Sequence, residues 1–457
     1  MSNKIYPIGI QNFEKIRNDG YFYIDKTALM YQMVKTGSYY FLSRPRRFGK
    51  SLLISTLEAY FQGKKELFEG LAVEKLEKDW IKHPILHLDL NIEKYDTPES
   101  LDKILNDNLE YWESQYGTRP SETSFSLRFA GIIQRACEKT GQRVVILVDE
   151  YDKPMLQAIG NEELQKQFRN TLKPFYGALK TKDGYIKFAL LTGVTKFGKV
   201  SVFSDLNNLD DISMWNEYVE ICGVSEREIH ENLEAELHEF AAARGITYDK
   251  LCEDLRECYD GYHFTHNSIG MYNPFSLLNA FKRKEFGSYW FETGTPTYLV
   301  KLLKKHHYDL ERMAHEETDV QVLNSIDSES TNPIPVIYQS GYLTIKGYDE
   351  EFGMYRLGFP NREVEEGFIR FLLPFYANVN KVESPFEIQK FVREVRSGDY
   401  NSFFHRLQSF FADTTYEVIR DQELHYENVL FIVFKLLGFY TKVEYHTSEG
   451  RIDLVLQ

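Results

Sequence analysis

Short apolar runs that alternate with helical stretches constrain the fold of this chain most strongly. Buried strands are expected at 39–43, 85–90, 143–150 and 185–194. The run ILHLDL at 85–90 alternates too little for a half-exposed strand. Helices are expected at 50–61, 98–113, 124–139 and 161–180, the last with a kink or break at Pro174. Strands alternating with helices favour an α/β domain with a mainly parallel sheet.

One loop between a strand and a helix has the features of a phosphate-binding loop. The segment RPRRFGKS, residues 44–51, ends like the pattern G-x-x-x-x-G-K-[ST], but Arg44 stands where that pattern has glycine. A GKS triplet alone is a weak signal, and the strand before it and the helix after it strengthen it. The N–H groups at the start of that helix favour phosphate. Lys50 would then reach the β- and γ-phosphates, Ser51 would help hold Mg²⁺, and Gly49 would let the backbone approach the ligand.

A second motif, VVILVDE, places Asp149 and Glu150 at the end of a buried strand. In a metal-dependent NTPase, Asp149 would hold Mg²⁺ directly or through water, and Glu150 would polarise the attacking water. Two solvated acids at a strand end are the simpler alternative, and the phosphate loop upstream argues against it. At the next strand end, Thr192 or Thr195 could contact the γ-phosphate or the water, and Lys196 could add charge. A plain turn fits each of these last three residues as well.

Composition and net charge limit the kinds of partner that this chain is expected to bind. The 457 residues carry a net charge of −14, which gives no overall basic field for nucleic acid. The apolar runs are too short to span a bilayer, the N-terminus has no secretory pattern, and the four cysteines lack disulfide-like spacing. We therefore expect a cytoplasmic protein with reduced thiols and no membrane partner.

The pattern changes after residue 215. Ser225 and Glu228 have capping-box spacing at the start of a helix that would end at Gly245. Residues 341–360 indicate two short strands around a turn that contains glycine. A helix before such a hairpin fits a winged helix, and a plain hairpin fits equally well.

Several motifs together resemble a bacterial family of AAA-like ATPases. They are FEKIRNDGYFYIDKT, FLSRPRRFGKSLL, VDEYDKP, LTGVTKFGKVSVFSDLNNLDDIS, CYDGYHF and YNPFSLLNAF, and they extend over nearly the whole chain. The resemblance implies that RPRRFGKS itself serves as the P-loop and that VDE is the Walker B motif. Arg46 and Arg47 could act as phosphate ligands or could contact a partner or the acidic strand ends. The expected nucleotide contacts are Arg46, Arg47, Phe48, Gly49, Lys50, Ser51 and Leu52.

The same resemblance implies a PD-(D/E)XK nuclease-like C-terminal domain. Asp453 in SEGRIDLVLQ is similar to its first metal-binding carboxylate, and Glu427 is similar to a further acidic site residue. The E-x-K strand that should follow is not in the sequence, so we do not expect DNA cleavage by this chain. The expected divisions are an ATPase domain at 1–215, a helical region at 216–330, a winged-helix-like region at 331–375 and a partial nuclease-like domain at 376–457.

These features predict a Mg²⁺-dependent ATPase in which Glu150, Lys50 and Thr192 act in catalysis. ATP is favoured over GTP by the resemblance and because no guanine-reading N-K-x-D is present. No arginine finger can be assigned, and a homo-oligomer could supply one. Two other classes stay open: a nucleotide-gated switch or scaffold with little hydrolysis, and a DNA-binding regulator that contacts nucleic acid through its C-terminal region.

Overall fold

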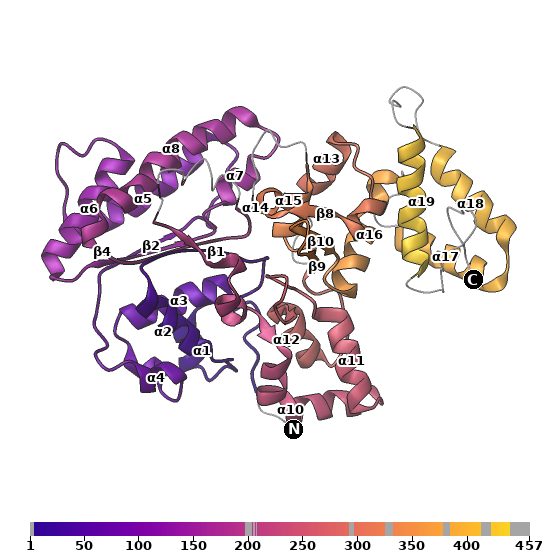
Figure 1. Cartoon of the computed structure of the whole chain (residues 1–457), viewed down its shortest axis with the longest axis horizontal. Coiled ribbons are helices and arrows are strands. Elements are labelled where there is room, and N and C mark those ends of the chain that lie inside the picture. Colours follow the sequence, from indigo (N-terminus) through magenta and orange to yellow (C-terminus); the bar gives the residue numbers. More distant parts are fainter. Residues whose placement is uncertain are drawn as a thin grey trace.

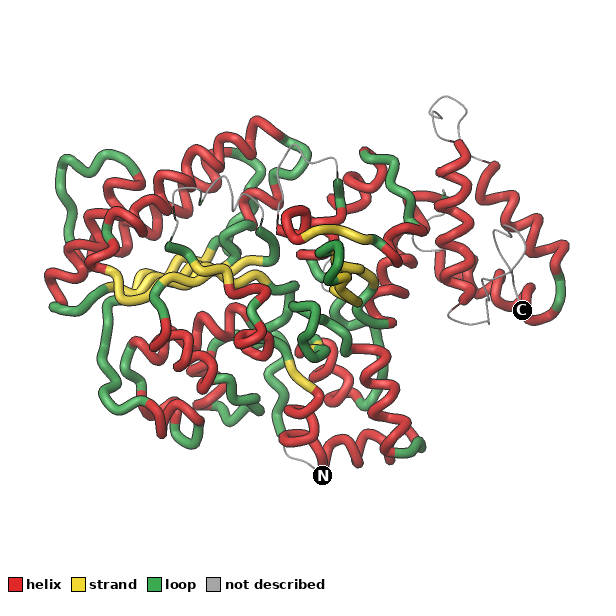
Figure 2. Tube along the Cα trace, viewed as in Figure 1, coloured by secondary structure: helices red, strands yellow, loops and turns green. Residues whose placement is uncertain are grey.

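The computed structural model describes residues 4–196, 203, 206, 208–291, 297–324, 332–377, 384–412 and 422–438. The molecule is elongated, with a sheet and its helices at one end and three C-terminal helices at the other (Figure 1). Figure 2 shows the strands gathered mainly in one central layer of the N-terminal part.

A five-stranded sheet forms the centre of the N-terminal part, and all its paired strands are parallel. The strand order is β2-β3-β4-β1-β5. This arrangement confirms the predicted α/β fold with a mainly parallel sheet and the four strands expected from sequence. The strand bounds are β1 Tyr39–Ser43, β2 Ile85–Asp89, β3 Val144–Asp149, β4 Ile186–Gly193 and β5 Asp210–Asp211.

Helices cover both faces of this sheet (Figure 1). One face carries α1 Phe13–Asn18, α2 Thr27–Thr36, α3 Lys50–Phe61 and α4 Ala72–Leu76. The other face carries α5 Pro98–Tyr116, α6 Phe125–Thr140, α7 Lys153–Gln157 and α8 Glu162–Thr181. Short 3₁₀ helices lie at Lys65–Phe68, Asp183–Tyr185, Ile212–Met214, Asn216–Ile221 and Glu311–His315.

The expectation that 85–90 is a strand buried on both faces is wrong. β2 is the edge strand of the sheet, and its residues alternate between buried and half-buried. Alternate side chains point to opposite faces of a strand, so Ile85, His87 and Asp89 form one half-buried face of β2.

Pro174 does not break its helix, in contrast to the expectation from sequence. α8 continues through it from Glu162 to Thr181. The ring of Pro174 removes the N–H that would bond to the carbonyl of Asn170, and Asn170 is exposed, so water can satisfy that carbonyl. On the inner face Phe168, Leu172 and other apolar side chains are buried, and α8 packs mainly against α6 and also contacts α5 and α7.

A helical unit follows the sheet. It contains α10 Glu226–Arg244, α11 Tyr248–Tyr259 and α12 Pro274–Arg283, and a small pair of strands, β6 Val224–Ser225 and β7 Met271–Tyr272. The predicted capping box of Ser225 and Glu228 is present at the start of α10. The helix ends at Gly245, which has φ 67°.

A three-stranded antiparallel sheet in the order β8-β10-β9 lies beside the helical unit. Its strands are β8 Glu317–Asp319, β9 Thr344–Asp349 and β10 Met354–Gly358, so the hairpin expected at 341–360 is present. The helices of this part are α13 Thr297–Lys305, α14 Val320–Asn324, α15 Ile334–Gln339 and α16 Arg362–Tyr376.

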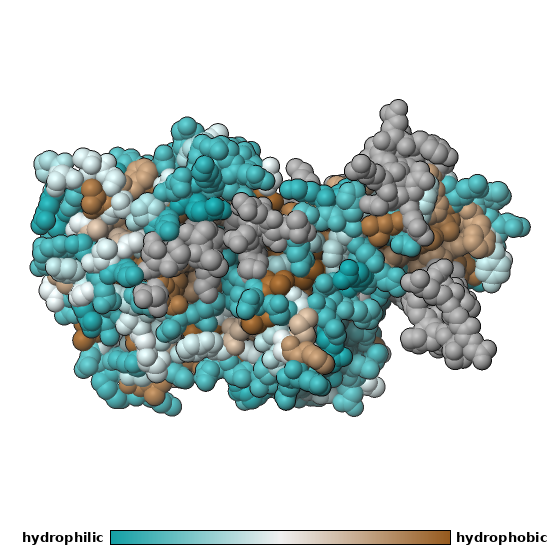
Figure 3. Space-filling model, turned by 45° about the horizontal axis from the view of Figure 1, so that its top comes forward, coloured by the Kyte–Doolittle hydropathy of each residue, from teal (hydrophilic) through white to brown (hydrophobic). Residues whose placement is uncertain are grey.

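The C-terminal helices are α17 Ser384–Ser397, α18 Tyr400–Ala412 and α19 Gln422–Gly438. Figure 3 shows apolar side chains gathered over this end of the molecule, where Phe386, Tyr400 and Phe404 are exposed. No helix within the described ranges is both long enough and apolar enough to cross a lipid bilayer.

Candidate nucleotide site

The carboxyl ends of β1, β3 and β4 meet at one edge of the sheet because the strands are parallel and neighbours. Ser43 is in register with Gly193, and Val148 is in register with Leu191. The loop after β1, the acids after β3 and the threonine near the end of β4 therefore converge, as the sequence predicted. Such an edge is the usual place for ligands in open α/β sheets.

Lys50 is the first residue of α3 and lies at the centre of this edge. It is 3 % exposed, and its Nζ lies 3.4 Å from Glu150 Oε1. The same Nζ donates hydrogen bonds to the carbonyl oxygens of Arg44 at 3.0 Å and Pro45 at 3.3 Å. All of these partners are oxygen acceptors, which phosphate oxygens could replace.

Arg44 has a structural role that explains why the loop tolerates it in place of glycine. Within the loop, only Arg47 and Gly49 have positive φ, at 64° and 99°, so position 44 does not need the left-handed conformation. The Arg44 guanidinium is buried and donates to the carbonyl oxygens of Ser43, Ser213 and Tyr218.

The same guanidinium lies 3.9 Å from the centre of the Phe264 ring. Burial lowers the pKa of Arg44 to about 10, so the group stays charged at neutral pH. Arg44 therefore ties the phosphate loop to the segments that follow the sheet.

The other residues of the loop differ in where their side chains point. Arg46 donates to the Tyr342 hydroxyl at 3.1 Å, and its guanidinium lies 5.6 Å from the Trp290 ring centre. Arg47 is exposed, with its guanidinium 5.1 Å from the ring centre of Phe275. Both arginines contact aromatic residues outside the loop, so either would have to turn to bind phosphate.

Phe48 is buried, and its ring packs against Tyr262 and Phe264 with ring centres 4.8 Å and 5.6 Å away. Its carbonyl accepts a hydrogen bond from the Gly223 N–H at 3.0 Å. Tyr262 is itself buried, so its side chain serves packing beside the loop.

The two acids after β3 have different surroundings. Asp149 is buried, and its Oδ1 accepts from the Thr192 hydroxyl at 2.5 Å and from the Glu150 N–H at 3.1 Å. Glu150 has φ 54°, an uncommon value for a residue other than glycine, and its carboxylate faces Lys50. The Thr192 hydroxyl thus holds Asp149 and is not open toward solvent.

Mg²⁺ fits the donor set on chemical grounds. Asp149 Oδ2 accepts no hydrogen bond from the part of the chain that the structure describes, and Ser51 follows Lys50 in the first turn of α3. No cluster of three His, Cys, Asp or Glu side chains suited to a metal occurs within the described ranges. Magnesium keeps several waters and binds one or two protein oxygens together with substrate phosphates, so Ser51 and Asp149 would suffice.

Sequence reasoning did not single out Asp152, which is fully buried behind Glu150. Its carboxylate accepts from the N–H groups of Val194 at 3.2 Å and Thr195 at 2.6 Å and from the Thr195 hydroxyl at 2.7 Å. Thr195 therefore faces Asp152 and does not face Lys50. The spacing of Asp149 and Asp152 gave no signal of this, because the contact depends on where β4 ends.

The stability of the chain is expected to fall with rising pH through Asp152. Burial, and then the charge of Glu150, raise the pKa of this carboxyl to about 7. Aspartate in the unfolded chain has a pKa of about 4. Between that pH and pH 7 the native state binds more protons than the unfolded state, so the free energy of unfolding decreases as pH rises. From pH 5 to 8 wild type should lose about 1–3 kcal/mol more than Asp152→Asn, measured by urea unfolding. Parallel pH curves for the two proteins would contradict this assignment.

The remaining sequence-predicted residues lie elsewhere. Lys196 is buried and pairs with Asp211 at 2.8 Å. Glu427 is exposed on α19, and Asp453 lies outside the described residues. Whether these two acids form a nuclease-like site therefore stays a prediction.

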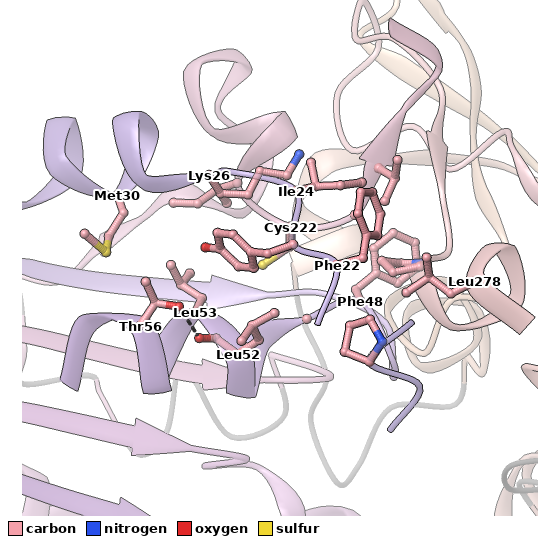
Figure 4. A pocket seen from close by; sticks show the side chains of 17 residues that line it. Phe22, Ile24, Lys26, Met30, Phe48, Leu52, Leu53, Thr56, Cys222 and Leu278 are labelled. Atoms are coloured by element: carbon pink, nitrogen blue, oxygen red, sulfur yellow. Dashed lines mark hydrogen bonds between the residues drawn. The ribbon is translucent and has the colours of Figure 1, made fainter. Parts of the chain in front are cut away.

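An apolar cavity of ≈ 110 Å³ lies beside the phosphate loop, and no motif predicted it. Figure 4 shows side chains from the N-terminal segment, from α3 and from the helical unit around one space. Lys26, at its edge, is paired with Glu228 at 2.5 Å. The lining residues are Pro7, Phe22, Tyr23, Ile24, Lys26, Met30, Phe48, Gly49, Leu52, Leu53, Thr56, Ile221, Cys222, Gly223, Val224, Pro274 and Leu278.

Comparisons with known proteins indicate the family of this chain. The family described as "AAA-ATPase_like: Predicted AAA-ATPase" matches residues 7–203. An Azotobacter chroococcum mcd 1 protein, described as an uncharacterized protein in the vnfD 5' region, is 35 % identical over 470 residues. That alignment covers 100 % of this chain and 87 % of the relative.

Among solved structures, the ORC2 protein of Aeropyrum pernix, in ADPNP–ADP complexes, is 9 % identical. The match covers 79 % of this chain and 92 % of that protein, with a TM-score of 0.27, which is too low to support an argument about fold. The family match includes both the phosphate loop and the acids after β3. The chain belongs to the AAA-ATPase-like family of predicted ATPases.

Proposed function

We propose that this protein binds ATP at the loop of residues 44–52 and hydrolyses it with Mg²⁺. One observation supports this most strongly: Lys50, at the start of α3, lies 3.4 Å from Glu150, at the end of β3. A cation that can hold phosphates and a carboxylate that can polarise water are thus adjacent across the sheet edge.

Each residue has a distinct part in the proposed reaction. The N–H groups at the start of α3 and the Lys50 ammonium would bind the phosphates. Ser51 and Asp149 would hold Mg²⁺, which neutralises charge on the phosphate oxygens. Glu150 would take a proton from the attacking water. Thr192 would act as a positioning residue, since its hydroxyl already fixes Asp149.

The apolar cavity is suited to the nucleotide base. It adjoins Gly49 and Leu52, so a base there would be continuous with phosphates bound at the loop. Its apolar walls can enclose a planar ring, and the few polar groups at its edge can orient it. We assign the cavity to adenine.

Blocking this cavity is expected to weaken ATP binding without affecting phosphate binding. Leu278 lines the cavity, and Leu278→Trp would occupy the space of the base. The affinity for ATP should fall on the order of 10- to 100-fold, while the affinity for inorganic triphosphate stays unchanged. Isothermal titration would measure both, with Leu127→Trp at an exposed position of α6 as the matched control. Equal losses for ATP and triphosphate would contradict a base site here.

The proposal also concerns the winged-helix-like and nuclease-like regions after residue 215. The order β8, α14, α15, β9, β10 fits the winged-helix-like region expected at 331–375, and it begins earlier, at β8. The divisions at 215, 330 and 375 stay predictions from sequence. A nuclease-like role for 376–457 rests on resemblance alone, and we assign no cleavage activity to it.

The direct test is phosphate release from ATP by the 457-residue chain over a series of protein concentrations, with Mg²⁺ or with EDTA. Release that needs Mg²⁺ is expected, and a rise per chain with concentration would indicate that copies assemble. ATP binding without release would favour the second candidate, a nucleotide-gated switch. The observation behind that candidate is that Arg46 contacts residues outside the nucleotide site. If the chain neither binds ATP nor releases phosphate, the proposal is contradicted.

A further inference from the structure

The small sheet and its helices dock directly on the phosphate loop. We call residues 317–324 and 332–358 the β8–β10 unit, after its first and last strands. Its contacts with the sheet domain include residues at the ends of α14 and α15 and in the turn after α15. They fall at two places: the phosphate loop and the segment after β4.

The first contact involves Pro45 and Arg46. Gly341 has φ 87°, and a Cβ added there would lie 2.6 Å from Pro45 Cβ, so the turn after α15 lies directly on the proline ring. The next residue, Tyr342, is buried, and its hydroxyl accepts from Arg46 Nη2 at 3.1 Å. The Arg46 carbonyl accepts from Trp290 Nε1 at 2.9 Å. Both the backbone and the side chain of Arg46 are thus held from outside the sheet domain.

The second contact involves Gln339, the last residue of α15, which is buried. Its side-chain oxygen accepts from the Lys196 N–H at 2.5 Å, and its amide nitrogen donates to the Leu323 carbonyl in α14. Lys196 Nζ donates to Asn324, which also belongs to α14. Lys196 directly follows Thr195, which Asp152 holds. The unit is therefore fixed at both strand ends, β1 and β4, that border the nucleotide site.

The residues of α15 are buried, in contrast to those of a helix that reads DNA. In winged-helix and related DNA-binding units the second helix enters the major groove and is open to solvent. Here Ile334, Val336 and Ile337 are buried, and the tip of the hairpin carries Asp349, Glu350 and Glu351. All residues of α15 are buried except Tyr338, which is half-buried, so the helix has no exposed face for DNA.

The contacts of Lys50 connect this docking to the nucleotide. Lys50 now donates to the carbonyls of Arg44 and Pro45, and Pro45 is the residue on which Gly341 rests. Phosphates at the loop would draw Lys50 away from those carbonyls and would attract the Arg46 guanidinium away from Tyr342. The docked unit and bound phosphates therefore require different positions of the Arg46 side chain.

We propose that the β8–β10 unit is a clamp on the phosphate loop that competes with nucleotide phosphates for Arg46. This inference rests on the proposed function. Nucleotide binding loosens the unit, and by linkage a weaker clamp binds nucleotide more tightly. The chain would then report its nucleotide state through the position of α15.

Tyr342→Phe tests the clamp because it removes only the hydroxyl that Arg46 contacts. ATP affinity of the variant, measured by isothermal titration with Mg²⁺, should rise about three- to tenfold over wild type. Tyr348→Phe, on β9 of the same unit, is the matched control and should bind ATP as wild type does. In wild type, saturating ATP should also speed hydrogen exchange of the amides at 334–342.

The outcomes separate the clamp from the function on which it rests. If wild type binds ATP and Tyr342→Phe binds it equally well or more weakly, the clamp is overturned and the proposed function is not. Slower exchange at 334–342 with ATP would overturn it as well, since nucleotide would then tighten the docking. Wild type that binds no ATP would overturn the proposed function and the clamp together.

Discussion

Lys50→Ala is expected to lower the affinity for ATP by about 100-fold or more and to abolish turnover. The ammonium of Lys50 is buried at the start of α3, and charged hydrogen bonds to phosphate contribute about 1.5–3 kcal/mol each. Fluorescent ATP titration and phosphate release with Mg²⁺ would measure the two effects.

Lys94→Ala is the control for this change. Lys94 is largely exposed and pairs with Asp96, far in sequence from the loop, so its removal should alter neither binding nor turnover. Circular dichroism should be the same for wild type and both variants. Full ATP affinity in Lys50→Ala would exclude residues 44–52 as the phosphate site.

Glu150→Gln is expected to keep ATP affinity near that of wild type and to reduce turnover by about 10²–10⁴-fold. Glutamine has the size of glutamate, so the site keeps its shape. Its amide cannot accept a proton from water at neutral pH. Single-turnover hydrolysis with bound ATP would isolate the chemical step from product release.

Glu350→Gln, at the exposed tip of the β9–β10 hairpin, removes the same charge far from the site and should leave turnover unchanged. A Glu150→Gln protein with wild-type turnover would show that another group activates the water. If wild type hydrolysed ATP no faster than Glu150→Gln, the result would favour the nucleotide-gated switch over the ATPase.

Local sequence patterns were sufficient for the elements that carry the site. The start of α3 at Lys50 follows from Gly49 and the apolar residues behind it, and the end of β3 follows from the change from valine to two acids. These features depend on residues adjacent in the chain. For the same reason the hairpin β9–β10 and the capping box of α10 could be predicted.

Features that depend on distant neighbours could not be predicted. The edge position of β2 depends on the strand order, and the continuity of α8 through Pro174 depends on the helices packed against it. The burial of Arg44 depends on carbonyls at 213 and 218. The apolar cavity combines residues from 7–30, from the phosphate loop and α3, and from 221–278, and no short motif contains them.

The most direct test of the nucleotide site is a crystal structure of the chain with Mg²⁺ and a non-hydrolysable ATP analogue. We predict phosphates at the N–H groups of residues 48–51 and the base between Phe22 and Leu278. Lys50 Nζ should have moved from the carbonyls of Arg44 and Pro45 to phosphate oxygens. An analogue bound elsewhere, or Lys50 still on those carbonyls beside bound phosphates, would contradict the account.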